Sequence, residues 1–325
     1  MDALSDILRV VRLSGAIFFH ARFTAPFCYG AAGTSELAAL VEPGAERLII
    51  FHLITQGECW IELEGCEPVR LQAGDVALLP QDHPHRMASA PGLPTQPGGE
   101  LAALISPQPR LISYGGGGAP TLMVCGFMSC DAGLGRMLLT GLPPVVRAPM
   151  RGTEAWCWLE ASVDYALAEA QSGRPGGAGV LAKLAEVLFI EVLRKRMECE
   201  DEDSVGWLAG VKDRVVGAAL AALHRQPAHP WTLEELARSV GASRSVLAER
   251  FQRLMCVSPM QYLTQWRMVM AANLLRGSAA QLTQIAEDVG YQADTAFIRA
   301  FRRQYGQSPA AWRRAQAIAA AAEAS

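Results

Sequence analysis

The stretches Leu236–Gly241 (LARSVG) and Ile285–Gly290 (IAEDVG) repeat one pattern 49 positions apart in a chain of 325 residues. A second match follows 50 positions apart, where Phe251 and Ser258-Pro259 recur as Phe301 and Ser308-Pro309. In each copy, apolar residues fall at helical spacing before the glycine and again after it. Each copy therefore predicts a helix, a turn at glycine and a second helix, which is a helix-turn-helix unit.

The turn residues differ between the two copies. Gly241 follows the first short helix, where the left-handed backbone conformation costs glycine little. Ser243 then stands where a hydroxyl caps the next helix. In the second copy Ala293 occupies the matching position, which leaves Asp294 or Gln292 as the predicted cap.

The segment between the copies predicts a stiff connector. Residues 259–275 carry large apolar side chains at helical spacing, which is typical of one long helix. If the two second helices point the same way and lie about 34 Å apart, they fit successive major grooves on one face of B-DNA. The predicted DNA-contacting residues are Ser243, Arg244, Ser245, Glu249, Arg253, Thr295, Arg299, Arg302 and Arg303. The alternative for any single arginine among them is a solvated helix face.

Charge divides the chain into two parts. Residues 1–210 carry 15 Lys+Arg and 24 Asp+Glu, a net charge of −9, whereas residues 211–325 carry 14 and 8, a net charge of +6. An acidic run from Glu198 to Asp203 predicts a linker over residues 198–212. We therefore predict a first domain at residues 1–197 and a DNA-binding domain at residues 213–325.

Composition excludes several classes of protein. Half of the residues are hydrophobic and 19% are charged, so the chain is expected to fold into globular domains. No stretch of about 18 apolar residues occurs, which predicts no transmembrane helix. The N-terminus lacks the pattern of a secretion signal, which predicts a cytoplasmic protein. Eight scattered cysteines are expected to be mostly free thiols.

The first domain predicts a β-barrel or sandwich followed by helices. Short apolar or alternating runs at residues 48–53, 59–63 and 76–80 are separated by glycine-containing turns, as expected of several short strands. Residues 156–170 and 180–197 have apolar stripes at helical spacing. Such helices pack on the sheet or on a second subunit.

The basic domain resembles the AraC/XylS family of transcriptional regulators. The resemblance covers residues 211–314 and rests on Gly290-Tyr291, Phe297, Phe301-Arg302-Arg303, Gly306, Ser308-Pro309 and Trp312-Arg313. It implies two helix-turn-helix units joined by a long helix, with Ser245, Glu249, Thr295 and Arg299 facing the DNA groove. Glu249 departs from the basic or amide residue often found there, and either accepts from a cytosine amino group or contacts no base.

The first domain resembles the cupin-type ligand-binding domains attached to many such regulators. His52 and Glu58, followed by Gly74, Pro80 and His85, are similar to the two cupin motifs. The resemblance implies a site for a divalent transition metal formed by His52, Glu58 and His85, with His83 nearby. Ile54 replaces one histidine ligand, so the favoured alternative is a set of structural histidines and no cofactor.

Together these observations predict a two-domain α+β protein, with an N-terminal cupin-like barrel and a C-terminal all-helical DNA-binding domain. We expect a transcriptional regulator, an activator by preference and not an enzyme, that senses a small molecule, dimerises, binds operator DNA and contacts RNA polymerase. The alternative is a cupin-type metalloenzyme or redox sensor fused to a DNA-binding domain. Oxidant sensing would use Cys28, Cys59, Cys66, Cys125 or Cys130, whereas inert buried thiols are the favoured interpretation.

Overall fold

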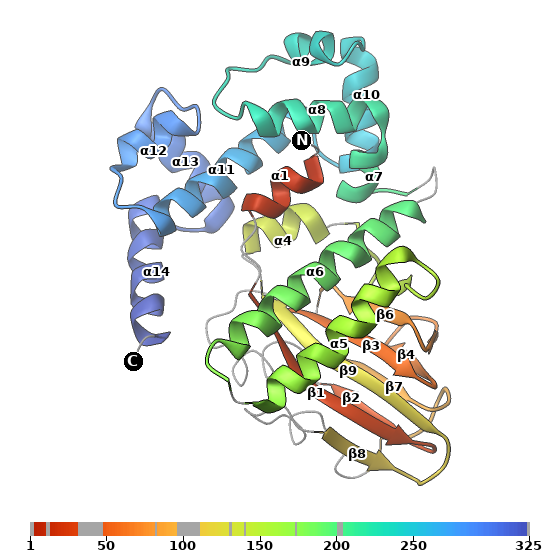
Figure 1. The fold of residues 1–325 in the computed structure, drawn as a ribbon. Coiled ribbons are helices and arrows are strands. Elements are labelled where there is room, and N and C mark those ends of the chain that lie inside the picture. The colour runs from red at the N-terminus through yellow and green to blue at the C-terminus, as the bar shows by residue number, and fades with distance from the viewer. Residues whose placement is uncertain are drawn as a thin grey trace. The chain divides into compact units, whose positions relative to one another are not determined.

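A computed structural model of the protein describes residues 3–10, 14–31, 48–81, 83–95, 111–129, 132–139, 141–172, 174–199 and 204–323. The chain divides into two compact units (Figure 1). The barrel unit comprises Leu13–Cys130 and Leu142–Cys199, and the helical unit comprises Met1–Arg12, Asp131–Gly141 and Glu200–Ser325.

The barrel unit contains two sheets. Among the described residues, the strand order is β10-β6-β3-β9-β1-β8 in one sheet and β2-β7-β4-β5 in the other. The pairing of β1 with β8 is parallel, and the other pairs are antiparallel. The strands are β1 (Ser14–Thr24), β2 (Cys28–Ala31), β3 (Leu48–Gln56), β4 (Glu58–Leu63), β5 (Val69–Gln72), β6 (Asp75–Leu79), β7 (His85–Ala88), β8 (Leu111–Gly115), β9 (Pro120–Ser129) and β10 (Val146–Pro149).

Strand β3 shows why both faces of the larger sheet are apolar. Ile50 and Ile54 belong to the core between the sheets, whereas Phe51 and Leu53 point to the opposite face. There the helices α5 (Glu154–Ser172) and α6 (Gly177–Glu198) cover the sheet, as Figure 1 shows. The strands predicted at residues 48–53, 59–63 and 76–80 and the two predicted helices are confirmed.

The helical unit confirms two helix-turn-helix units. Its helices are α1 (Ala3–Val10), α4 (Ala132–Leu139), α7 (Trp207–Lys212), α8 (Arg214–Arg225), α9 (Leu233–Ser239), α10 (Arg244–Met255), α11 (Pro259–Gly277), α12 (Leu282–Asp288), α13 (Asp294–Tyr305) and α14 (Pro309–Glu323). Helices α9 and α10 form the first unit, and α12 and α13 form the second. The predicted connector is α11, which runs between them (Figure 1).

The structure corrects the predicted domain limits in two places. Within the predicted linker at residues 198–212, Glu198 ends α6 and Trp207 begins α7 with its side chain only 1% exposed. Residues 200–203 of the acidic run lie outside the described residues. Helices α1 and α4, predicted within the first domain, pack instead in the helical unit, α1 on α8 and α4 on α7 and α11. Burial of their apolar faces explains this placement, since Leu4, Ile7 and Leu138 are buried.

Among the described residues, no helix has both the length and the apolar character that crossing a bilayer requires.

Candidate functional site

The first helix-turn-helix unit has the turn chemistry that its sequence predicts. Gly241 adopts a φ of 67°, in the left-handed region that favours glycine. The Ser243 hydroxyl accepts a hydrogen bond from the backbone N–H of Val246 at 3.3 Å, which caps the start of α10. The prediction that Ser243 caps this helix is confirmed.

The second unit lacks the corresponding cap. Gly290 has a φ of 86°, so the turn itself is repeated. Ala293 is the N-cap residue of α13, and the described residues provide no side-chain cap hydrogen bond there. The prediction that Asp294 or Gln292 provides the cap is therefore wrong, because Asp294 already lies inside the helix and Gln292 before its N-cap position.

Helices α10 and α13 present matched faces. Leu247, Phe251 and Leu254 of α10, and Phe297 and Phe301 of α13, are buried. Because a helix repeats every 3.6 residues, the opposite face carries the predicted pairs. These pairs are Ser245 with Thr295 and Glu249 with Arg299, and all four side chains are exposed.

The flanking arginines are exposed as well, but they face different surroundings. Arg244 begins α10, and Arg302 follows Arg299 on the outer side of α13. Arg303 also lines a cavity of about 780 Å³ beside α11. The charge of Arg303 lies close enough to Tyr291 to oppose the rise of its pKa that burial causes. Arg303 is thus at the edge of the predicted DNA-binding face.

Other basic residues of this unit form ion pairs within the unit. Arg250 forms an ion pair with Asp213 at 3.2 Å, and Asp213 caps α8 by accepting from Val215 and Val216. Arg238 pairs with Glu234 one helical turn away. By contrast, Arg299 is exposed, and it forms no side-chain ion pair with any of the described residues.

The structure adds three candidates that sequence reasoning missed. Gln252 is exposed on the same side of α10 as Ser245, one turn beyond Glu249. The 50-residue offset pairs Gln252 with Arg302, and this signal was available in the sequence. Val246 and Ile298 are 40% and 38% exposed although both are apolar, and apolar side chains on such helices contact thymine methyl groups.

Inside the barrel unit, three polar side chains from three strands form a buried chain. His52 Nδ1 lies 2.8 Å from Cys125 Sγ, and His52 Nε2 lies 2.8 Å from His85 Nε2. His85 Nδ1 lies 3.1 Å from the carbonyl oxygen of His83. His52, His85 and Cys125 are at most 4% exposed.

The carbonyl of His83 determines which atom donates in each hydrogen bond that joins His85, His52 and Cys125. A carbonyl only accepts, so Nδ1 of His85 donates to it, and in a neutral imidazole Nε2 of His85 is then the acceptor. His52 must donate from Nε2, which leaves its Nδ1 to accept from the Cys125 thiol. Burial supports the neutral forms, because it lowers the pKa of His85 to about 4 and that of His52 well below its usual value.

The predicted metal-ligand set is divided in the structure. His52 and His85 meet, but Glu58 is exposed and pairs with Arg70. His83 bonds through Nε2 to the side chain of Gln81. Among the described residues, no group of three or more histidine, cysteine, aspartate or glutamate side chains has the arrangement of a metal site. In the structure, His52 and His85 thus lie together, whereas the other two predicted ligands, Glu58 and His83, bond elsewhere.

The cysteines of the barrel unit fall into two classes. Burial raises the pKa of the thiols of Cys28, Cys59 and Cys125, which disfavours the reactive thiolate. Cys66 is exposed. Cys130 lies outside the described residues.

Comparison with known proteins identifies both halves of the chain. Residues 2–198 match a family model described as Cupin, and residues 236–315 match one described as Helix-turn-helix domain. An AraC-like transcription regulator of Streptomyces antibioticus is 33% identical over 323 residues, which cover 97% of this chain and 99% of the relative. The chain belongs to the AraC family of transcriptional regulators.

Other relatives of this AraC-family regulator agree. The RCS-specific HTH-type transcriptional activator RclR of Escherichia coli is 26% identical over 272 residues, which cover 83% of this chain and 86% of RclR. The solved DNA-binding domain of AdpA, in complex with a target DNA, is 32% identical and covers 32% of this chain and 92% of that domain, with a TM-score of 0.30. The helix-turn-helix match and the AraC-like relative of Streptomyces antibioticus make DNA a partner of the regulator.

Proposed function

We propose that the regulator binds a bipartite operator, with α10 and α13 in two successive major grooves. The observation that carries this proposal is the repetition of one exposed face on two helices joined by α11. Ser245 and Glu249 on α10 match Thr295 and Arg299 on α13, and each pair lies opposite buried residues. The similar faces of α10 and α13, joined by the single helix α11, suit an operator with two similar half-sites.

Within this interface we propose that some side chains contact bases and others contact phosphates. Arg299 and Gln252 reach base edges, since guanidinium groups pair with guanine and amides with adenine. Arg244, Arg253 and Arg302 contact phosphates, which fix the position of the protein on the duplex. Ser243 and Arg303 lie at the margins of the face, so we expect smaller effects from their substitution. The net charge of +6 on residues 211–325 supports phosphate binding.

We further propose that the cupin-like barrel senses a small molecule and forms a homodimer, and that the protein activates transcription through RNA polymerase in the cytoplasm. The name of the relative RclR supports activation. We do not propose a metalloenzyme, because the candidate ligands Glu58 and His83 are bonded elsewhere. Binding of an effector shifts a pre-existing equilibrium between DNA-competent and incompetent arrangements.

The connectivity of the chain provides a route for this signal. Strands β1 and β9 pair along their length, with Ser14 opposite Ser129. From these two ends the chain continues to α1 and α4, which pack on α8, α7 and α11 of the helical unit. We propose that the effector signal passes along these two covalent connections to both helices.

Selection of DNA from a random pool by the full-length protein, followed by hydroxyl-radical footprinting, tests the bipartite operator. We expect two protected tracts about 10 base pairs apart on one face of the duplex. Protection of a single tract would contradict the proposal. Equal protection of all sequences would show that phosphate charge alone determines binding.

A further inference from the structure

Arg267, in the middle of the connector α11, bonds to a loop of the first helix-turn-helix half. Its Nε donates to the carbonyl oxygen of Pro227 at 2.7 Å, and its Nη2 donates to that of His229 at 2.9 Å. Both acceptors lie between α8 and α9. The planar guanidinium with its fixed fork of donors suits two neighbouring carbonyl groups.

The same guanidinium contacts the second helix-turn-helix half. Its central carbon lies 5.7 Å from the centre of the Tyr291 ring, in the range of a cation–π contact. Tyr291 follows Gly290 in the turn between α12 and α13. Arg267 therefore lies between the loop before α9 and the turn before α13.

The loop and the turn also touch directly. A Cβ atom at Gly290 would lie 2.7 Å from both Cα and the carbonyl oxygen of Ala228, and 2.9 Å from Nη2 of Arg267. These distances are too short for any side chain, and two of the three atoms belong to backbone. The glycine is thus required both by its φ of 86° and by the approach of the other half.

The loop is itself fixed to α9. His229 Nε2 lies 2.6 Å from Oε1 of Glu235 in that helix. The indole N–H of Trp231 donates to the carbonyl oxygen of Gln226 at 3.0 Å. The loop that Arg267 contacts is therefore itself bonded to α9 of the first unit.

We propose that Arg267 is a positioning residue that locks the two helix-turn-helix units in one relative orientation, and so sets the operator spacing that the regulator accepts. A single helix fixes the distance between its two ends, but each unit can still rotate about its own contact with that helix. The contact of Arg267 with Pro227, His229 and Tyr291 removes this freedom. This inference rests on the proposed binding to two half-sites.

A spacing experiment on the full-length protein tests the lock. The probes are the selected operator and the same operator with about 3 base pairs inserted between its half-sites, which turns one half-site by about 100°. We expect the insertion to weaken wild-type binding about 100-fold, because two linked contacts become one. Arg267→Ala should bind the selected operator more weakly than the wild type does. The insertion should then lower the affinity of this variant by less than about tenfold.

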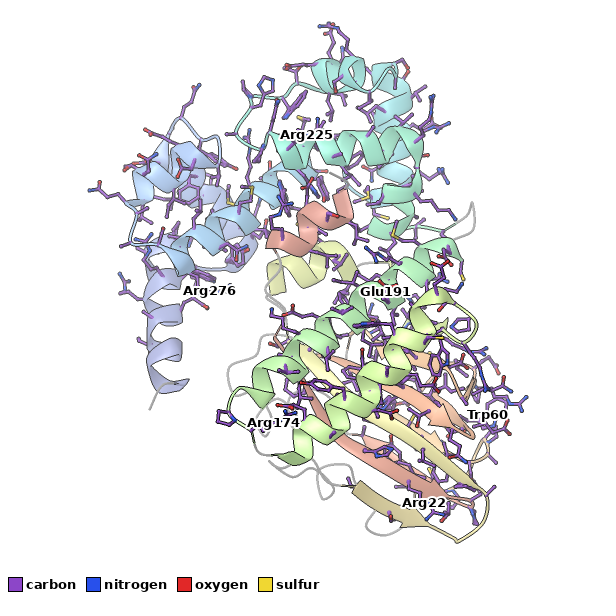
Figure 2. The ribbon with its side chains drawn as sticks, viewed as in Figure 1. Arg22, Trp60, Arg174, Glu191, Arg225 and Arg276 are labelled. Carbon is purple, nitrogen blue, oxygen red and sulfur yellow. The ribbon has the colours of Figure 1, made fainter. Side chains whose placement is uncertain are left out.

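Arg276 provides a matched control on the same helix, where it is labelled in Figure 2. Its guanidinium also donates one hydrogen bond, to Gln316 at 3.0 Å, and contacts an aromatic ring, that of Trp312 at 5.0 Å. Both partners belong to α14, so Arg276→Ala removes similar contacts without touching the first unit. We expect Arg276→Ala to keep the wild-type spacing dependence.

The outcomes separate the two proposals. A wild type that tolerates the insertion overturns binding to two half-sites, and the lock with it. If the insertion weakens binding by the wild type and by Arg267→Ala to the same extent, the role of Arg267 is overturned, but binding to two half-sites is not. If Arg267→Ala does not fold, Arg267→Lys replaces it in the same experiment, because lysine keeps the charge but lacks the planar fork of donors. We expect the insertion to weaken binding by Arg267→Lys less than binding by the wild type.

Discussion

Arg299 is exposed on α13, where it matches Glu249 of α10 through the repeat. Arg299→Ala is expected to weaken binding to the selected operator by about 1 to 3 kcal/mol, the usual cost of a lost bidentate base contact. Binding to random DNA should change little, because phosphate contacts remain. Competition binding by fluorescence anisotropy measures both affinities.

The control for this prediction is Arg314→Ala. Arg314 is exposed on α14 and is not one of the predicted DNA-contacting residues. Its loss should affect operator and random DNA by the same small factor. If Arg299→Ala likewise lowers both affinities equally, Arg299 contacts phosphate and carries no specificity.

His85 makes the stability of the barrel unit depend on pH. Burial lowers the pKa of folded His85 to about 4, below the unfolded value of about 6.5, so the unfolded chain binds the proton more readily. The contribution is fully present above pH 6.5 and is lost as the pH falls toward 4, by up to about 1.4 kcal/mol per pH unit for each proton. We expect urea midpoints measured from pH 7 to pH 4.5 to fall more steeply in the wild type than in His85→Gln.

Burial also lowers the pKa of three other described histidines, His20, His52 and His224, which set the background of this experiment. The pKa of His224, in the helical unit, is lowered to about 3. The contributions of His20 and His224 persist in His85→Gln, whereas His52 contacts His85. The difference between the two slopes therefore reports on the His52–His85 pair. Identical slopes would show that replacing His85 does not change the proton uptake of this pair on unfolding.

At the scale of elements, α10 and α13 form an internal comparison of helix capping. Both begin after a residue with extended backbone, but Ser243 caps α10 whereas Ala293 leaves α13 without a cap. Ala293→Ser is expected to stabilise the helical unit by about 1 kcal/mol, and Ser243→Ala to destabilise it by about the same amount. Chemical denaturation measures both changes.

The two cap variants control each other. The same hydroxyl is added to one helix-turn-helix unit and removed from the other. Equal destabilisation by both substitutions would mean that a serine at position 293 makes no hydrogen bond to the start of α13. Operator affinity of Ala293→Ser should stay close to that of the wild type, because the cap lies before the groove-facing residues.

At the scale of the whole molecule, α1 precedes the barrel strands in the sequence but packs in the helical unit. Ile7 is fully buried, and α1 packs on α8. Ile7→Ala is expected to remove about 2 to 5 kcal/mol of packing, enough to release so short a helix. Hydrogen exchange of the α8 amides in the full-length protein should then become faster.

Arg9→Ala is the matched control for this experiment, because its side chain is 61% exposed and pairs on the surface with Asp6. It should leave the exchange of α8 unchanged. Unchanged exchange in Ile7→Ala would show that α1 does not protect α8 and would remove α1 from the proposed signalling route.

The sequence alone determined the helix-turn-helix units, since a cap such as Ser243 or a turn such as Gly241 depends on neighbours only a few residues away. It also indicated the short strands and their helices, whose periodicity is equally local. Only the tertiary structure decided that His52 meets His85, 33 residues away, and Cys125, 73 residues away, while Glu58 turns to solvent. It alone decided that α1 and α4 join the helical unit and that Arg267 holds both halves of it. The reason is that strand register and the burial of distant apolar faces depend on contacts between segments far apart in the chain, which no local pattern records.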